Sequence, residues 1–313
     1  MRSAAPVSAR GLWWIPPLLA LFWGLNWPAV KVALGALPPF TLRAVGLGSG
    51  ALLLLLWLAW RRQPLLPPRA AWPGVLLSGL LTIAVFNLAT AWAQLNTSTS
   101  RAAVLTFTMP MMAALLAWWL LGERPGRRRL WSLACGAVGI GLLAWPVFGQ
   151  LADAGADAAR AWKGLIFPLV AAFGWAAGNV LLKRWPVPGD RITVTAWQLA
   201  IGAVCGLVGA LWAGERGLVG PMNAAVWTAL GFHIVLGTAV AYGLWFVLAE
   251  RVDATVAALT TLAVPVVGVL AAMLLVGDRP SATDWWGFGF VLAGAAGAML
   301  RLREDDSAVA GRR

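Results

Sequence analysis

Charge is scarce in this sequence, and negative charge is the scarcer of the two signs. Of 313 residues, 12% are charged and 60% are hydrophobic, whereas an average soluble domain carries about 25% charged residues. A soluble protein this apolar could not cover its surface with polar side chains, so part of its solvent must be lipid. The net charge of +12 lies in short loops between apolar runs. This scatter excludes the concentrated basic patch of a nucleic-acid-binding protein.

Residues that carry catalytic or metal chemistry are equally sparse. The chain has one histidine and two cysteines, and Cys135 and Cys205 both lie in apolar runs without metal-ligand spacing. All twelve carboxylates fall at the ends of apolar runs, in loops or in the C-terminal tail. An intramembrane enzyme needs a convergent set of reactive groups at one depth. We therefore expect no enzymatic activity, no metal and no cofactor. Ion-coupled antiporters usually need a membrane-embedded carboxylate, so its absence also argues for passive, gradient-driven transport.

Long apolar runs are what the sequence has in abundance. A membrane-spanning helix needs about 20 mostly apolar residues. This criterion predicts an all-α membrane protein with ten transmembrane helices. Their expected ranges are 12–35, 38–60, 72–94, 98–121, 128–147, 162–182, 191–213, 223–248, 252–276 and 284–302.

The ten runs form two sets of five. Pro110 followed by Gly122-Glu123-Arg124-Pro125 returns as Pro265 followed by Gly277-Asp278-Arg279-Pro280, at a constant offset of 155 residues. Because five is odd, the second set enters the membrane from the opposite side. The sequence thus predicts two inverted five-helix repeats, a symmetry typical of alternating-access transporters with a substrate site near the membrane midplane. The expected domains are a first repeat at 12–147, a linker at 148–161, a second repeat at 162–302 and a disordered tail at 303–313.

Most of the 24 Lys and Arg residues fall in loops on the N-terminal side of the predicted bundle. The positive-inside rule then predicts that both termini are cytoplasmic. We expect a multi-pass protein of a bacterial-type cytoplasmic (inner) membrane. Its expected partners are the lipid bilayer and a small-molecule solute, without nucleic acid, and we expect a monomer.

Several short motifs carry a family resemblance. They are Trp23-Gly24-Leu25-Asn26, the segment from Pro38 to Arg43, and the duplicated proline and Gly-acid-Arg-Pro elements. From about residue 12 to 302 the chain resembles the drug/metabolite transporter superfamily, specifically proteins with two EamA domains. The resemblance implies an exporter of amino acids or related metabolites, and within that group it points to the aromatic amino-acid exporter (YddG-like) branch. One departure is the first helix, which lacks the glutamate kept by small multidrug transporters of the superfamily.

These observations favour a carrier that exports small metabolites, amino acids and aromatic ones in particular, by alternating access without an intramembrane carboxylate. The alternative is proton-coupled efflux of drugs or other amphiphilic cations, for which His233 is the remaining candidate proton carrier. A lone histidine at this depth is more often a hydrogen-bonded residue of the lumen. A membrane scaffold would leave polar residues at matching positions of both halves unexplained.

Polar and deep aromatic residues within the apolar runs form the candidate site, because a polar side chain in lipid must face a cavity or a partner helix. The candidate substrate-binding residues are Trp23, Asn26, Trp27, Asn87, Trp175, Asn179, Gln198, His233 and Tyr242. The candidates for gating or for the mouth of the pathway are Lys31, Arg43, Gln94, Pro110 and Pro265. Two pairs of these residues, Arg43 with Gln198 and Asn87 with Tyr242, match at the repeat offset.

Each candidate also has a structural interpretation. The amides can equally form interhelical hydrogen bonds, and the tryptophans can pack against neighbouring helices rather than stack on a solute. Lys31 can snorkel to the interface; the functional alternative for Lys31 and Arg43 is an electropositive mouth or a partner for a substrate carboxylate. Pro110 and Pro265 predict matched kinks in the fourth and ninth helices. The Gly-xxx-Gly pairs at 46/50 and 202/206 predict close packing of the second and seventh helices.

Overall fold

The computed structural model describes residues 14–122, 126–150, 156–245 and 254–299, and within them the protein is helical and contains no strand. The predicted Glu123 turn and the predicted tail at 303–313 lie outside the described residues. The helices are α1 (Ile15–Ala33), α2 (Pro39–Trp60), η2 (Arg69–Ala71), α3 (Trp72–Ser78), η3 (Gly79–Val85), α4 (Phe86–Asn96), α5 (Thr99–Thr106), α6 (Met109–Leu121), α7 (Arg127–Gln150), α8 (Ala156–Arg184), α9 (Arg191–Trp212), α10 (Ala224–Phe232), η5 (His233–Val240), α12 (Ala254–Leu275) and α13 (Ala282–Met299).

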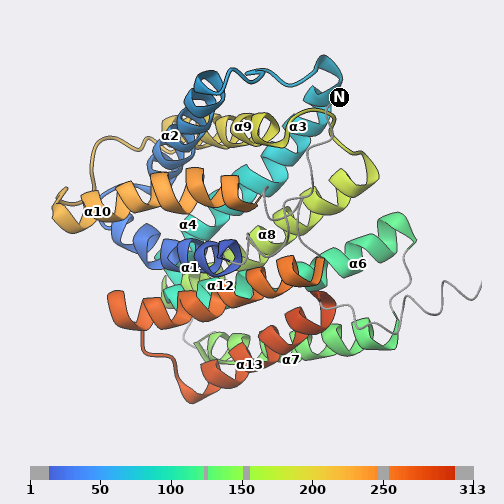
Figure 1. Ribbon diagram of the computed structural model, residues 1–313. Helices are drawn as coiled ribbons and strands as arrows, with labels where there is room; N and C mark the ends of the chain where they lie inside the picture. Colours follow the sequence, from blue (N-terminus) through green and yellow to red (C-terminus); the bar gives the residue numbers. More distant parts are fainter. Residues whose placement is uncertain (1–13, 123–125, 151–155, 246–253, 300–313) are drawn as a thin grey trace, which may run out of the picture.

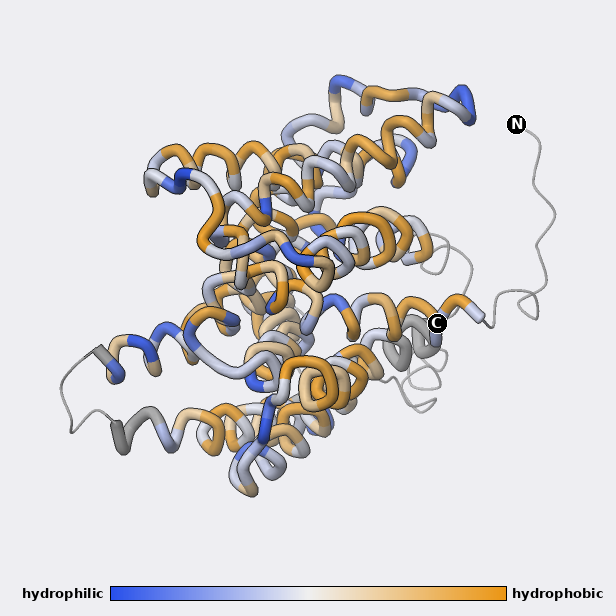
Figure 2. The backbone as a smooth tube through the Cα atoms, turned by 90° about the vertical axis from the view of Figure 1, so that its left-hand side faces the viewer, coloured by the Kyte–Doolittle hydropathy of each residue, from blue (hydrophilic) through white to orange (hydrophobic). Residues whose placement is uncertain are grey.

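Helices occupy most of the described part of every range in which the sequence predicts a span. Six of them are long and apolar enough to cross a membrane, and two shorter apolar helices cover Leu130–Pro146 and Thr261–Leu275. Hydrophobic residues dominate the helices, while hydrophilic residues gather mainly in the turns and at helix ends (Figure 2). The chain is therefore an all-α membrane protein. Helix α7 continues to Gln150 and α8 begins at Ala156, so both enter the segment expected to be a linker.

The fourth predicted span differs from expectation in its middle. The sequence predicted one kinked helix, but α5 ends at Thr106 and α6 begins at Met109, with Phe107 and Thr108 in a turn between them. Pro110 lies in the first turn of α6, where the missing N–H has no intrahelical partner to lose. Pro265 instead lies inside α12. The two prolines are therefore not equivalent kinks, because the first follows a break between two helices and the second lies within one continuous helix.

Two π-helical segments interrupt corresponding spans in the two halves of the chain. The first, η3, covers Gly79–Val85, and the second, η5, covers His233–Val240. Their starts lie 154 residues apart and their ends 155 apart, which is the offset of the sequence duplication. A π-helical turn contains an extra residue and is often found at functional sites. The wider turn changes the direction in which the following side chains point.

Two helix pairs form the opposite ends of the bundle, with α1, α4, α8 and α12 between them (Figure 1). One end pairs α2 with α9, and the other pairs α7 with α13. Glycines permit the first contact: a Cβ on Gly206 would lie 2.8 Å from the backbone nitrogen of Ala44. The neighbouring π segments pack on the same two helices, with Thr238 against Gly50 and Ile83 against Gly202.

Carboxylates connect the two halves at the ends of the helices. Glu215 accepts hydrogen bonds from the backbone N–H groups of Phe40 and Thr41, at 3.1 and 2.8 Å, at the start of α2. A second connection, which we call the α5 clasp, joins Ser100 and Arg101 to the α12–α13 turn. In the α5 clasp, Asp278 accepts from the N–H (2.7 Å) and hydroxyl (2.9 Å) of Ser100, and Arg101 pairs with Asp284 at 2.5 Å.

We predict that Gly206→Ala destabilises the protein by about 1–3 kcal/mol, the usual cost of overpacking a tight contact. The added methyl would meet backbone atoms of α2, which cannot rotate away, so α2 and α9 must separate. The matched control is Gly48→Ala, because a Cβ there would lie 3.4 Å from the Cβ of Ala203, an ordinary contact. Thermal unfolding of the detergent-solubilised variants, followed by size-exclusion chromatography, measures the difference. Equal unfolding temperatures for the two variants would contradict the prediction.

Candidate functional site

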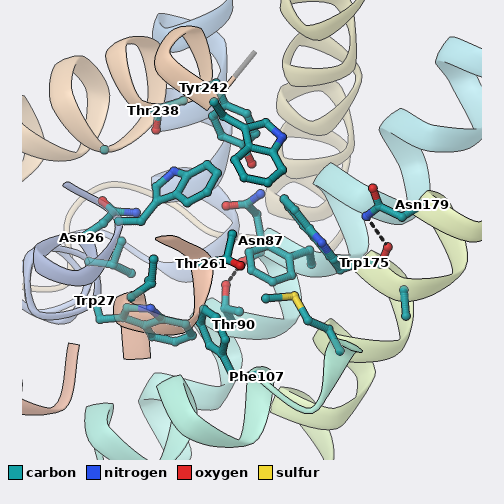
Figure 3. A pocket seen from close by; sticks show the side chains of 18 of the residues that line it. Asn26, Trp27, Asn87, Thr90, Phe107, Trp175, Asn179, Thr238, Tyr242 and Thr261 are labelled. Atoms are coloured by element: carbon teal, nitrogen blue, oxygen red, sulfur yellow. Dashed lines mark hydrogen bonds between the residues drawn. The ribbon is translucent and has the colours of Figure 1, made fainter. Parts of the chain in front are cut away.

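A cavity of about 230 Å³ lies in the centre of the bundle and is lined from both halves of the chain (Figure 3). The first half contributes residues of α1, α2, α4 and the α5–α6 break, and the second contributes residues of α8, η5 and α12. The lining residues that the sequence singled out are Trp23, Asn26, Trp27, Arg43, Asn87, Gln94, Pro110, Trp175, Asn179, His233 and Tyr242.

Aromatic rings form much of the cavity wall. Trp23 packs edge-on against Tyr242 with ring centroids 5.8 Å apart, and it lies 5.6 Å from Trp245. On another side, Phe86 and Trp175 are 5.0 Å apart. These rings pack against one another, as the packing interpretation expects, and they also line the cavity.

Polar side chains interrupt the aromatic wall at a few points. The Nδ1 of His233 lies 2.8 Å from the Oδ1 of Asn26, so the ring donates this hydrogen bond. The hydroxyl of Thr90 donates to the backbone oxygen of Asn87 and accepts from the Nη2 of Arg43, each at 3.0 Å. Asn87 donates through Nδ2 to the Ile83 oxygen at 3.0 Å and also interacts with the side chain of Tyr242.

In each half of the chain, a polar residue that lines the cavity follows shortly after a π-helical segment. Asn87 lies two residues beyond the end of η3, and Tyr242 lies two residues beyond the end of η5. Both point toward the cavity (Figure 3). The π-helical turns therefore precede equivalent polar residues in the two halves. This repetition explains why residues 155 apart in the sequence reach one space.

Asn179 has a different setting from the other amides. It is exposed, and its Nδ2 donates to the Trp175 oxygen one helical turn earlier, at 2.8 Å (Figure 3). It lines one side of the cavity on α8. In the first half, Asn26 lies 153 residues earlier, close to the repeat offset, and it instead uses its side-chain oxygen to accept a hydrogen bond from His233. The two asparagines match in sequence but not in hydrogen bonding.

Three predicted site residues lie outside the cavity lining. Gln198 is buried between α9 and α3, where its Nε2 donates to the Ser78 hydroxyl at 2.6 Å. Lys31 is not a free cation at a mouth, because its Nζ donates to the Gln94 backbone oxygen and joins α1 to α4. Pro265 is buried inside α12. For Gln198, the geometry supports the interhelical hydrogen bond that the sequence left open. Lys31 also joins two helices by a hydrogen bond, which neither of its two interpretations anticipated.

The structure adds lining residues that the sequence did not single out, notably Phe86, Thr90, Phe107, Thr238 and Thr261. Threonine is a weak signal in a membrane helix, since its hydroxyl commonly bonds to its own backbone. Thr90 could have been found from its spacing. It lies three residues after Asn87, which was already a candidate, and residues three apart share a helix face. Phe107 reaches the cavity only because the helix breaks beside it.

The cavity has a distinctive charge pattern. Among the described residues that line it, Arg43 is the only one with a formal charge. The carboxylates that the structure describes, Asp157, Asp190, Glu215, Asp278 and Asp284, all lie at helix ends or in turns. Within the described ranges, no group of His, Cys, Asp and Glu residues is arranged to hold a metal ion.

Comparisons with known proteins give a consistent result. The profile of the EamA-like transporter family matches the chain twice, at residues 10–145 and 162–300. The chain is 27% identical over 256 residues to the "Uncharacterized transporter YvbV" of Bacillus subtilis (strain 168), covering 82% of this chain and 81% of that one. It is 25% identical over 286 residues to a "Probable amino-acid metabolite efflux pump" of Escherichia coli (strain K12), covering 88% and 91%. A solved crystal structure shares the fold, with a TM-score of 0.63 and 21% identity over 96% of this chain and 100% of that chain.

We predict that Asn26→Ala lowers the free energy of unfolding by about 1–3 kcal/mol, because it leaves the buried Nδ1–H of His233 without an acceptor. The control is Asn179→Ala, which removes an exposed amide bonded within its own helix. This control should change stability by no more than about 0.5 kcal/mol. Chemical denaturation in detergent, followed by tryptophan fluorescence, compares the two variants. If Asn26→Ala were as stable as Asn179→Ala, the hydrogen bond to His233 would not hold the site together.

Proposed function

The chain belongs to the EamA-like transporter family, and from this premise we propose that it is a carrier that exports small metabolites, amino acids in particular, by alternating access. Its family and its relatives are transporters rather than enzymes. The observation that carries the proposal is the central cavity, which both halves of the chain line with aromatic rings and isolated polar groups. Such a mixture suits a small amphiphilic solute.

The architecture we propose is ten spans in two inverted repeats, at 12–147 and 162–302, with both termini on the cytoplasmic side of the inner membrane. Support comes from the double match of the family profile and from the equivalent π-helical segments. The contacts between helices also follow the pattern that a two-fold axis between the two halves would produce. Helix α1 packs against α12, and the corresponding α8 packs against α5 and α6, while α2–α9 and α7–α13 pair with their own counterparts.

The relationship to amino-acid efflux pumps supports the substrate class. Two of the relatives, from Escherichia coli and Salmonella typhimurium, are each named "Probable amino-acid metabolite efflux pump", at 25% and 24% identity. The proposed site consists of the candidate residues that line the cavity, with Trp23, Trp175 and Tyr242 as the aromatic surfaces. Lys31, Gln198 and Pro265 are left out of it.

The rival function, proton-coupled efflux of cationic drugs, has no feature of the cavity in its favour. A cationic solute would meet Arg43 and no described carboxylate. His233 is engaged through Nδ1 with Asn26, and its Nε2 lies against Gly46. Uncoupled exchange is the simpler mechanism for this set of residues.

We predict that the purified full chain in proteoliposomes exchanges labelled amino acids by counterflow, with aromatic ones fastest. The panel comprises phenylalanine, tryptophan, leucine, threonine and arginine. Counterflow needs no imposed ion gradient, so collapsing the pH gradient should leave the rate unchanged. Protein-free liposomes provide the control. Absence of exchange across the whole panel would remove amino acids as the substrate class, and abolition by an uncoupler would favour the proton-coupled alternative.

A second prediction concerns the inverted topology. Arg61 and Arg216 are separated by the repeat offset and follow the equivalent helices α2 and α9. In a background with Cys135 and Cys205 replaced by alanine, Arg61→Cys should react with a membrane-impermeant maleimide only from the cytoplasmic side. Arg216→Cys should react only from the outside. Labelling of both variants from one side would contradict inverted repeats and the mechanism built on them.

A further inference from the structure

Arg43 occupies an unusual electrostatic position in the central cavity. Its side chain is 3% exposed, and its Nη2 donates to the hydroxyl of Thr90 at 3.0 Å. Its Nε has no hydrogen-bond partner. No carboxylate is among the described residues that line the cavity, and the described carboxylates lie at helix ends or in turns. Within the described part of the protein, the guanidinium therefore lacks a counter-charge. Its buried Nε is an unused donor, and Arg43 itself lines a cavity large enough for a small solute.

The second half of the chain shows what this position looks like when it is purely structural. Gln198 is the repeat counterpart of Arg43, and Ser78 is the counterpart of His233, both at an offset of 155 residues. Gln198 donates to Ser78 at 2.6 Å, so this neutral pair satisfies itself and lies outside the cavity lining. In the pair that does line the cavity, the Arg43 Nε and the His233 Nε2 are both unpartnered. The two equivalent pairs therefore differ: Gln198 and Ser78 satisfy each other, whereas Arg43 and His233 each keep one buried nitrogen without a hydrogen-bond partner.

A buried cation without a partner is costly, and removing an unpaired charge from a protein interior is usually favourable. A planar guanidinium is suited to a carboxylate, whose two oxygens can accept hydrogen bonds from neighbouring N–H groups. Thr90 restrains the guanidinium through Nη2, and the Thr90 hydroxyl is itself held by the Asn87 oxygen. Arg43 is thus held in place before any solute arrives, which limits the ordering cost of binding.

We propose that Arg43 binds the carboxylate of the solute, so that the cavity takes carboxylates with an aromatic or aliphatic side chain, zwitterionic amino acids included. Cationic or neutral compounds that lack the acid group are disfavoured. This assignment rests on the proposed function, because it concerns the same cavity. It adds the chemical group by which the solute is recognised and the residue that recognises it.

Pairs of compounds that differ only in the acid group test the assignment on the wild-type protein. The probes are 3-phenylpropionate against 3-phenylpropionamide, and phenylalanine or leucine against the corresponding amino-acid amide. Quenching of tryptophan fluorescence in detergent reports binding, since Trp23, Trp27 and Trp175 line the cavity. We expect each carboxylate to bind at least about tenfold more tightly than its amide, as a charge-assisted bond predicts. Equal affinities within the pairs would overturn the assignment.

Variants then test which residue produces the preference for the carboxylate. Arg43→Gln installs the residue that the second half carries at the equivalent position, and it should reduce the preference to within about twofold. Thr90→Val should also lower the preference for the carboxylate, because it removes the hydroxyl that restrains the guanidinium. This variant keeps the test decisive if Arg43→Gln does not fold. Gln198→Ala is the matched control, because it changes the equivalent position outside the cavity and should leave the preference intact. A full preference in both Arg43→Gln and Thr90→Val would overturn the role of Arg43.

Counterflow with the same compounds separates this assignment from the transport function. Carboxylate-selective binding without counterflow would leave the Arg43 site standing and overturn transport. Counterflow of carboxylates and amides at equal rates would overturn the Arg43 assignment and leave the transport function standing. Absence of binding and of counterflow for every probe would overturn both.

Discussion

The contact between the glycine-bearing faces of α2 and α9 and the π segments beside them is the constraint on which the cavity depends. At Gly50 and Gly202 the neighbouring π segment packs where a larger side chain would stand. His233, at the start of η5, lies against Gly46 in the same manner. In a membrane, where helices associate by close packing rather than by the hydrophobic effect, small residues determine how near two backbones come. The π turns lie at these contacts and precede the residues that point into the cavity, so removing a glycine would displace the polar groups as well as the helices.

Duplication explains the geometry of the cavity but not its chemistry. Equivalent helices bring equivalent positions to one space, which is why Asn87 and Tyr242 meet there. The residues at those positions have nonetheless diverged: Asn26 holds a histidine, whereas Asn179 bonds to its own helix. A perfectly symmetric pair of halves would present the same group twice. The difference between Arg43 and its equivalent Gln198 adds a further asymmetry, since Arg43 is the one cation among the described lining residues.

Much of the fold follows from the sequence because membrane helices are defined by length and hydrophobicity. The expected ranges 38–60 and 191–213 differ from α2 and α9 by one residue each. The break before Pro110 was not predictable, since a proline is compatible both with a kink and with a first helical turn. The π segments were equally hidden, because their residues are ordinary apolar ones. For the site, composition marked the polar residues correctly as unusual but could not separate Gln198 from Asn87. That distinction depends on Ser78, which lies 120 residues away from Gln198.

The α5 clasp and the α2–α9 contact join the two halves by different kinds of interaction. The bonds of the clasp join a helix N-terminus of one half to a turn of the other, where the side chains of Arg101 and Asp284 are 21% and 9% exposed. When polar and charged groups of this kind separate and become exposed, hydration offsets part of the interaction that is lost. The glycine contacts of α2 and α9 are close apolar contacts between backbones, which water would not replace in the same way. In the alternating-access mechanism proposed above, the α2–α9 contact would therefore serve as the pivot and the clasp as the contact that opens.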